Sequence, residues 1–455
     1  MTDTAAILRE HCLALFQAGI AAADPCAAVE QCLVVDDDQL KIRLEPHSSQ
    51  YRCANWQKIH IIAFGKAACA MAGAARRTIP PHQLAEPGLV VTTYENVEAV
   101  EGFEVLAAGH PLPDRNGLNA AQRIVERIRT IPAGDLVLVL ISGGGSALLP
   151  YPAEGVGLAG KIAATQLLLA CGADINQVNC VRKHLSLLKG GGLARQAAPA
   201  DLHALILSDV LGDDLSSIAS GPTVADATSY ADAIAVFKGK QVWDKVPATV
   251  KDHLEKGVAG LRPETLKPGD ALLNSVSHTL VGSNAISVSA TVQACRQHDY
   301  HTLIYSHNLS GEAREAAEQW VIAANILLTK GLTQATAMIA GGETTVTLTG
   351  TGKGGRNQEM ALAFALAAER HGLPCRWTFL SGGTDGRDGP TDAAGGIVDS
   401  DTLNSMRRAG IDPLAALNDN DSYTALYAAN ALVNTGATGT NVADLQILLL
   451  YPFSE

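Results

Sequence analysis

The stretch that decides the fold is LVLVLISGGGSALLP, Leu136–Pro150. Its first six residues are apolar without interruption, and Ser142, three glycines and Ser146 follow directly. An apolar run of this length, with no polar alternation, is typical of a strand that is covered on both faces in a parallel sheet. The stretch therefore predicts an α/β fold with a buried strand that ends in a glycine turn.

The glycine turn itself indicates an anion site. Residues without a Cβ adopt positive φ easily and let a ligand approach the backbone closely, so several N–H groups can converge on one anion. A tight turn without a ligand is the alternative interpretation. We predict that the turn binds phosphate through Ser142, Gly143, Gly144, Gly145 and Ser146.

Strand and helix patterns alternate around this stretch. Further strands are expected at 59–64, 88–93 and 203–208, and helices at 66–78, 118–129 and 157–170. This alternation predicts a doubly wound, mostly parallel sheet, in which ligands bind at the carboxyl ends of the strands.

The second part of the chain has a different composition and a different pattern of expected strands and helices. The stretch 250–274 is rich in Gly, Pro and charge, and we interpret it as a linker. Beyond it, 335–349 is expected to form two strands, the second half-exposed because Thr alternates with Val and Leu. Helices are expected at 311–328 and 358–369 and a last strand at 445–450, so that a smaller α/β domain with a mixed sheet follows the first.

Composition limits the partners. The chain has 455 residues and a net charge of −12, which argues against nucleic acid or an anionic membrane as the main partner. None of the nine cysteines forms a C-x-x-C pair, which is typical of reduced thiols. We see no secretory leader and no apolar run of 18 residues, so we expect a cytoplasmic protein; an anionic small molecule remains open as its substrate, and a homo-oligomer is compatible with the chain.

Two basic motifs stand out in this acidic chain. Lys66 follows Gly65 where a strand meets a helix, a position at which its charge opposes the helix dipole unless an anion is bound. Arg182 and Lys189 lie in the stretch RKHLSLLKGGG, in which three glycines follow Lys189 directly. Both residues are candidates to bind a carboxylate or phosphate. A solvated lysine and an ordinary basic helix face are the alternatives.

Carboxylates and one arginine complete the candidates. Asp209 follows a predicted strand, where it could bind Mg²⁺ or form a turn, and Asp385 lies in a glycine-rich loop and could serve a metal or the substrate. Arg356 follows a glycine-rich segment at a predicted helix start, and its planar guanidinium suits a transferring phosphoryl group.

The common nucleotide fingerprints are absent. In G-x-G-x-x-G, Leu148 stands where the last glycine belongs, and neither Gly65-Lys66 nor Gly352-Lys353 completes a G-x-x-x-x-G-K-[ST] loop. The residues alone therefore predict a two-domain α/β protein that handles phosphate or another anion.

Seven motifs taken together resemble the glycerate 2-kinase family, whose C-terminal part is the MOFRL domain and some of whose members carry the label hydroxypyruvate reductase. In chain order they are GKAACAMA, GHPLPDRNG, LISGGGSALL, VRKHLSLLKGGGLA, LILSDVLGDDLSSIASGPTV, GGETTVTLTGTGKGGRNQEMAL and SGGTDGRDGPTDAAGG. The resemblance covers nearly the whole chain. It implies a Rossmann-like domain over 1–275, a MOFRL-type domain over 276–455 and an active site in the cleft between them.

The resemblance also implies phosphorylation of D-glycerate at its 2-hydroxyl, with ATP and Mg²⁺. Lys66 and Arg356 would be the catalytic cations, and the turn from Ser142 to Ser146, with Lys189, would bind the nucleotide phosphates. Arg182 and Asp385 would bind glycerate and Asp209 the metal, while Asp209 and Asp385 both remain open as the general base. A nicotinamide-dependent hydroxypyruvate reductase and a non-catalytic anion-binding protein are the alternatives.

Overall fold

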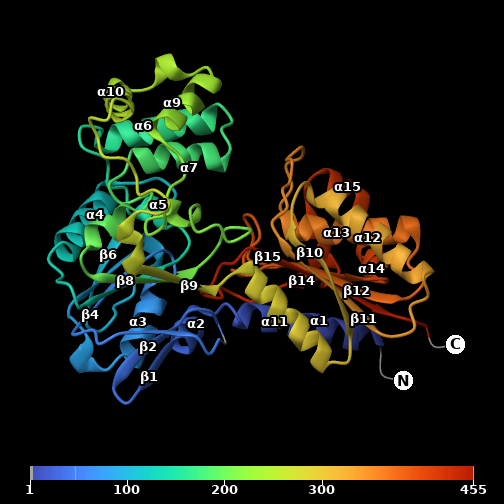
Figure 1. Cartoon of the computed structure of the whole chain (residues 1–455). Coiled ribbons are helices and arrows are strands. Elements are labelled where there is room, and N and C mark those ends of the chain that lie inside the picture. The colour runs from blue at the N-terminus through green and yellow to red at the C-terminus, as the bar shows by residue number, and fades with distance from the viewer. Residues whose placement is uncertain (1–3, 47, 454–455) are drawn as a thin grey trace. The chain divides into compact units, whose positions relative to one another are not determined.

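The computed structural model describes residues 4–46 and 48–453, and these form two compact units (Figure 1). The N-terminal unit comprises Pro25–Ser208 and Asp213–Val281. The C-terminal unit comprises the described residues up to Asp24, the short segment Asp209–Gly212 and the chain from Gly282 onward. Each unit has its own six-stranded sheet.

The sheet of the N-terminal unit has the strand order of a doubly wound nucleotide-binding fold. Its strands, in spatial order, are β6 (Phe103–Ala108), β5 (Gly88–Thr93), β4 (Ile59–Phe64), β7 (Leu136–Ile141), β8 (Asp201–Leu207) and β9 (Val276–Gly282). The pairs from β6 to β8 are all parallel. The chain order reverses between β4 and β7, and in open α/β sheets this switch point is where ligands bind.

Helices and a small sheet surround this core. The crossovers include α3 (Ala68–Thr78), α4 (Arg115–Ile128), α5 (Gly145–Leu148) and α8 (Gly192–Ala197). The three-stranded antiparallel sheet β1 (Leu33–Asp36), β2 (Gln39–Arg43) and β3 (Tyr51–Cys53) follows α2 (Pro25–Cys32). The sequence patterns did not predict this small sheet.

Four helices of the N-terminal unit pack around a core of their own. They are α6 (Gly157–Ala170), α7 (Ile175–His184), α9 (Tyr230–Gly239) and α10 (Ala248–Val258), and Figure 1 shows them gathered in one group. Val250 and Leu254 of α10 are fully buried in that core. The expectation of a linker over 250–274 is therefore wrong, because its first part is a packed helix, and Gly257 inside that helix leaves room for the Tyr230 ring of α9.

The C-terminal unit contains a mixed sheet. Its strands, in spatial order, are β10 (His301–Leu309), β11 (Thr336–Gly342), β15 (Asp444–Tyr451), β12 (Arg376–Gly383), β13 (Gly395–Asp399) and β14 (Leu432–Val433). Only β10 and β11 run parallel, and the other pairs are antiparallel. The predicted fold class, a mostly parallel sheet followed by a smaller α/β domain with a mixed sheet, is confirmed.

Helices cover both faces of this mixed sheet. On one face lie α12 (Ala313–Thr329) and α13 (Arg356–His371), together with α14 (Thr402–Arg408), α15 (Pro413–Asn418) and α16 (Ser422–Ala428). On the other face lie α1 (Thr4–Ala21) and α11 (Asn284–Gln297). Residues 4–24 thus complete the core of the C-terminal unit. The expected N-terminal domain over 1–275 had included them, so the observed division differs there.

One expected strand is absent from the described residues. Residues 344–349 alternate Thr with apolar residues, but only Thr345 makes an isolated bridge, to Glu312. The Glu312 carboxylate accepts hydrogen bonds from Thr345 Oγ1, Thr347 N and Thr347 Oγ1. These side-chain contacts replace a strand ladder, so the alternation was a misleading signal here.

Candidate functional site

The glycine turn lies at the switch point of the parallel sheet. Ser142 N donates to Phe64 O at 3.0 Å, and Lys66 N donates to Gly143 O at 2.9 Å. Ser142 Oγ accepts from Ala67 N at 3.1 Å. These bonds join the turn after β4 to the turn after β7, because the two strands are parallel neighbours.

Gly65 is required for this contact. Its φ is +127°, and a Cβ added there would lie 2.1 Å from Ser142 Oγ and 2.5 Å from Ser142 O. No side chain fits in that space, and L-residues rarely adopt that φ. The glycine therefore lets the Lys66 turn pack directly on the predicted phosphate turn.

Lys66 is exposed beside the same turn. A Cβ added at Gly144 would lie 3.6 Å from Lys66 Cγ and 3.1 Å from His110 Cδ2, so both side chains flank Gly144. Burial, and then the charge of Lys66, lower the pKa of His110. His110 belongs to the GHPLPDRNG motif, but the sequence reasoning did not name it as a site residue.

Lys189 reaches the far side of the turn. Its Nζ donates to Ser146 O and Ser146 Oγ, each at 2.9 Å, and to Ala219 O at 3.4 Å. Its side chain is buried, and burial lowers its pKa, followed by the charges of Lys161 and Arg182. Gly190 and Gly191, both with positive φ, let the chain turn away directly behind it.

A cavity of about 330 Å³ opens beside these residues. Its polar wall includes Lys161, Arg182, Lys189, Ser146 and the Gly144 backbone. No aspartate or glutamate is among its lining residues. An enclosed site with three cations and no carboxylate has the chemistry of an anion-binding site, because buried charge is costly unless a counter-charge is bound.

Lys161 is a buried cation of this cavity that the sequence reasoning also missed. It lies on α6 in the apolar run GLAGKIAATQLLLA and is only 4% exposed. Its Nζ donates to Leu185 O at 3.3 Å, and burial, followed by the charge of Arg182, lowers its pKa to about 7. A lone charge inside an apolar helix was the signal that could have identified it.

The candidate residues of the C-terminal unit gather at the start of α13. Arg356 Nε and Nη2 donate to the two oxygens of Asp444 at 2.6 and 2.9 Å, and Nη1 lies 2.7 Å from Glu343 Oε1. Burial opposes the charge of Arg356, but its hydrogen bonds to fully buried Asp444 outweigh this and raise its pKa. The arginine is thus held in a fixed orientation by two carboxylates that the sequence reasoning did not single out.

The two aspartates of the glycine-rich loop differ in role. Asp388 is buried, and its carboxylate accepts from Asn357 N at 3.1 Å and Gln358 N at 2.8 Å, which caps α13. Asp385 is half-buried and accepts from Arg387 N at 3.0 Å. A Cβ added at Gly383 would lie 3.2 Å from Asp385 Oδ1, so Asp385 remains near the strand end that carries it.

The proposed metal ligand Asp209 is half-buried in the segment Asp209–Gly212. Among residues 4–46 and 48–453, no three His, Cys, Asp or Glu side chains lie close enough together to hold a metal ion. Mg²⁺ commonly takes only one or two protein carboxylates and completes its shell with substrate phosphates and water. A single half-buried carboxylate such as Asp209 is enough for such an ion.

Each unit thus carries its own group of predicted residues. Lys66, Arg182, Lys189 and the turn 142–146 lie in the N-terminal unit, and the last three line or adjoin one cavity. Arg356, Asp385 and Asp209 belong to the C-terminal unit. The joint action of the two groups on one substrate stays a prediction.

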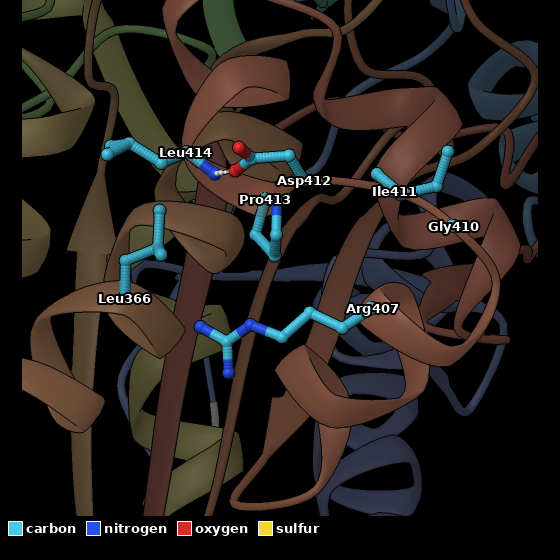
Figure 2. Close-up of a pocket in the computed structure, with 7 residues that line it drawn as sticks. All are labelled: Leu366, Arg407, Gly410, Ile411, Asp412, Pro413 and Leu414. Atoms are coloured by element: carbon cyan, nitrogen blue, oxygen red, sulfur yellow. Dashed lines mark hydrogen bonds between the residues drawn. The ribbon is translucent and has the colours of Figure 1, made fainter.

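A second hollow, of about 420 Å³, lies at α13, α14 and the loop before α15 (Figure 2). Its lining contains Arg407, whose guanidinium pairs with both oxygens of Glu369 at 2.7 Å. Figure 2 shows Asp412 accepting from Leu414 N rather than pointing to a ligand. Since its one arginine is already paired, this hollow is a poorer anion site than the first.

Comparisons with known proteins show the family of the chain. Residues 11–255 match the family described as a domain of unknown function, DUF4147, and residues 336–444 match the MOFRL family. The chain is 38% identical to glycerate 2-kinase of Pyrococcus horikoshii, over 97% of each chain. It is 39% identical to D-glycerate 2-kinase of Thermotoga maritima, over 87% of this chain and 91% of the relative.

A relative of Agrobacterium vitis, named putative hydroxypyruvate reductase, is 41% identical over 96% of this chain and 93% of the relative. Among solved structures, a Thermotoga maritima glycerate kinase matches with a TM-score of 0.85 at 37% identity, over 97% of this chain and 99% of that chain. These matches define a phosphotransferase of two α/β units. The chain belongs to the glycerate 2-kinase family.

No single helix among the described residues is both long and apolar enough to cross a membrane.

Proposed function

We propose that the protein transfers the γ-phosphoryl group of ATP to the 2-hydroxyl of D-glycerate, which yields 2-phosphoglycerate, ADP and a proton. The observation that carries the proposal is the cavity beside the glycine turn, with three cations and no carboxylate in its lining. Relatives named glycerate kinase, similar over nearly the full chain, support the same substrate.

The reaction asks mainly for placement and for neutralisation of the moving charge. We propose that the backbone of Gly143–Ser146 and Lys189 hold ATP phosphates, and that exposed Lys66 stabilises the transferring group. Arg182 binds an anionic group in the same cavity. Arg356, kept in place by Asp444, is the second catalytic cation of the proposal.

The acceptor hydroxyl must lose its proton as the new P–O bond forms. Asp209 and Asp385 are both half-buried carboxylates, and either serves this step in the proposal. Bound Mg²⁺ would neutralise phosphate charge, with Asp209 as its proposed protein ligand. Asp385 then remains to orient glycerate.

The proposal is tested by the product. Purified protein is incubated with ATP, MgCl₂ and D- or L-glycerate, ADP is followed by a coupled assay, and 2- and 3-phosphoglycerate are resolved by phosphorus NMR. We expect 2-phosphoglycerate from the D isomer. ADP formed without a phosphorylated glycerate, or only 3-phosphoglycerate, would overturn the assignment.

Variants test the two cations. Lys66→Met should lower kcat by roughly 10²–10⁴, the usual loss for one strong electrostatic contact with the transition state. Lys256→Met, at an exposed lysine paired with Asp252 on α10, is the control and should keep full activity. Arg356→Lys retains the charge but loses the paired bonds to Asp444, and its kcat should also fall while the protein stays folded.

The reductase alternative rests on relatives named putative hydroxypyruvate reductase. It predicts oxidation of NADH or NADPH by hydroxypyruvate at the rate of enzyme turnover. The switch-point turn lacks the third glycine of the dinucleotide fingerprint, with Leu148 in its place, so we expect no such consumption.

A further inference from the structure

The lining of the cavity beside the glycine turn is of two chemical kinds. Its charged residues are Lys161, Arg182 and Lys189, the first and last of them nearly inaccessible to solvent. Its apolar residues come from the 110–113 loop and from α6, where Leu169 lies two turns beyond Lys161. Of these, Leu112 and Leu169 are 60% and 59% exposed, which is unusual for leucines that line a hollow.

Polar side chains separate Lys161 from Leu169 along α6. Thr165 and Gln166 lie between them on this helix and line the same cavity. The Gln166 amide is exposed and has no hydrogen-bond partner among the described residues. An amide between an apolar wall and a cationic wall can both donate to and accept from a heterocycle.

We propose that this cavity is the nucleotide site of the proposed kinase, in which Lys161 holds the phosphate chain together with Lys189, and Leu112, Leu169 and Gln166 receive the adenine base. The inference rests on the proposed function and assigns one of its two substrates to the cavity. It adds Lys161 and a base subsite to the residues already named.

Charge and size favour the nucleotide over glycerate. Glycerate carries one negative charge and would leave at least two buried cations without a counter-charge, whereas a triphosphate matches all three. Pockets for ligands of nucleotide size have volumes of roughly 300 to 1,000 Å³, and the cavity of about 330 Å³ lies within that range. A three-carbon acid would also leave the exposed leucines without contact.

Direct binding separates this inference from the proposed function, because it needs no turnover. The non-hydrolysable analogue AMPPNP, with MgCl₂ and without glycerate, is titrated calorimetrically into wild-type protein and Lys161→Met. We expect a Kd raised by about 10- to 100-fold in the variant, the range of one charge-assisted contact. Lys240→Met, at an exposed lysine of the same unit whose Nζ donates to Gly172 O, should bind as wild type does.

Proton uptake gives a second readout. Burial, followed by the charge of Arg182, lowers the pKa of Lys161 to about 7, so at pH 8 much of Lys161 is neutral. Lys189, Arg182 and His110 line the same cavity, and Lys189 also has a lowered pKa. A bound phosphate chain favours the charged lysines, so wild type should take up protons on binding and Lys161→Met should take up fewer. The two are compared in buffers of different ionisation enthalpy.

The base subsite is tested with tripolyphosphate as a second probe. Leu169→Ala and Gln166→Ala should raise the Kd for AMPPNP several-fold and leave the Kd for tripolyphosphate unchanged. Equal affinity of wild type for the two probes would overturn the base subsite. An unchanged AMPPNP affinity in folded Lys161→Met, with a raised KM for glycerate, would assign the cavity to the acceptor instead, even if the kinase activity itself is confirmed.

Discussion

At the scale of single residues, Gly65 controls the geometry of the switch point. It combines a φ of +127° with backbone atoms of Ser142 within 3 Å of any added Cβ. Since Lys66 is its neighbour, a shift here moves a proposed catalytic cation as well as the fold.

We predict that Gly65→Ala lowers the free energy of unfolding by at least about 2 kcal/mol, from strain plus steric conflict. Gly134→Ala is the matched control, because Gly134 has a φ of +91° but nothing within 4 Å of an added Cβ. That control should lose only about 1 kcal/mol, the cost of a left-handed backbone. Urea unfolding measures both, and equal losses would show that the contact with Ser142 is not tight.

A second residue-scale prediction concerns Asp388. Burial raises the pKa of this carboxyl from 3.8 to about 7, against the favourable N–H donors of Gln358 and Asn357, and Asp444 raises it further. The folded protein therefore binds the Asp388 proton more tightly than the unfolded chain does. The stabilisation is complete below about pH 4 and is lost as the pH rises toward 7.

Asp388→Asn cannot ionise and keeps one of the two oxygens that accept from Asn357 N and Gln358 N, so it loses one of these hydrogen bonds at every pH. Its free energy of unfolding should therefore fall less between pH 4 and pH 7 than that of wild type, measured by urea unfolding at several pH values. A difference between the two proteins that is constant with pH would contradict the raised pKa.

At the scale of elements, sequence patterns found the strands of the parallel sheet best. The strands 59–64, 88–93 and 136–141 occur at their predicted bounds, because each is a short apolar run closed by glycine or polar residues. The patterns failed where tertiary contacts decide. Thr344–Thr349 is held by the Glu312 side chain, and α10 is stabilised by partners from α6 and α9.

For the candidate site, too, residues in a clear local pattern were predicted, and a residue that only tertiary contacts reveal was missed. The glycine turn was recognisable because three consecutive glycines follow an apolar run, and Arg182 and Lys189 because they are cations in an acidic chain; the structure places them around one cavity. Lys161 was missed because its helix looks like ordinary core, and only the fold reveals that its side chain ends beside Arg182.

The helix α1 is far in sequence from the sheet of the C-terminal unit on which it packs, and its contribution to stability can be tested. Phe16 is fully buried, and a Cβ added at Gly382 of β12 would lie 2.6 Å from Phe16 Cζ. Phe16→Ala should cost about 3–5 kcal/mol of the stability of the C-terminal unit. Leu13 lies on the same helix but is 40% exposed, so Leu13→Ala should change the stability of this unit by less than about 1 kcal/mol. Thermal unfolding followed at the tryptophans of this unit distinguishes the two.

At the scale of the whole molecule, the units are not consecutive pieces of chain. The C-terminal unit takes residues from both ends, and α1 covers apolar residues of its sheet such as Ile339, Leu445 and Ile447. A division at residue 275 leaves this face without its helix.

We therefore predict that a polypeptide of residues 276–455 exposes that face and binds the dye ANS strongly. Addition of a synthetic peptide of residues 1–24 should reduce the dye fluorescence and raise the melting temperature. A peptide with Phe16→Ala is the control and should have little effect. Full stability of 276–455 without any peptide would show that α1 is dispensable.

Because the C-terminal unit contains residues from before and after the N-terminal unit, its elements are synthesised far apart in time. The helix α1 leaves the ribosome before the other described elements of its unit, and β15 (Asp444–Tyr451), in the middle of the sheet that α1 covers, is the last of these elements to be made. At ordinary translation speed the helix waits roughly 20 to 80 s for the strand to emerge. Before β15 is made, the six-stranded sheet of the N-terminal unit already has all of its strands, so that unit folds first, and a ribosome that stops before the codons of β15 leaves the other sheet without an inner strand.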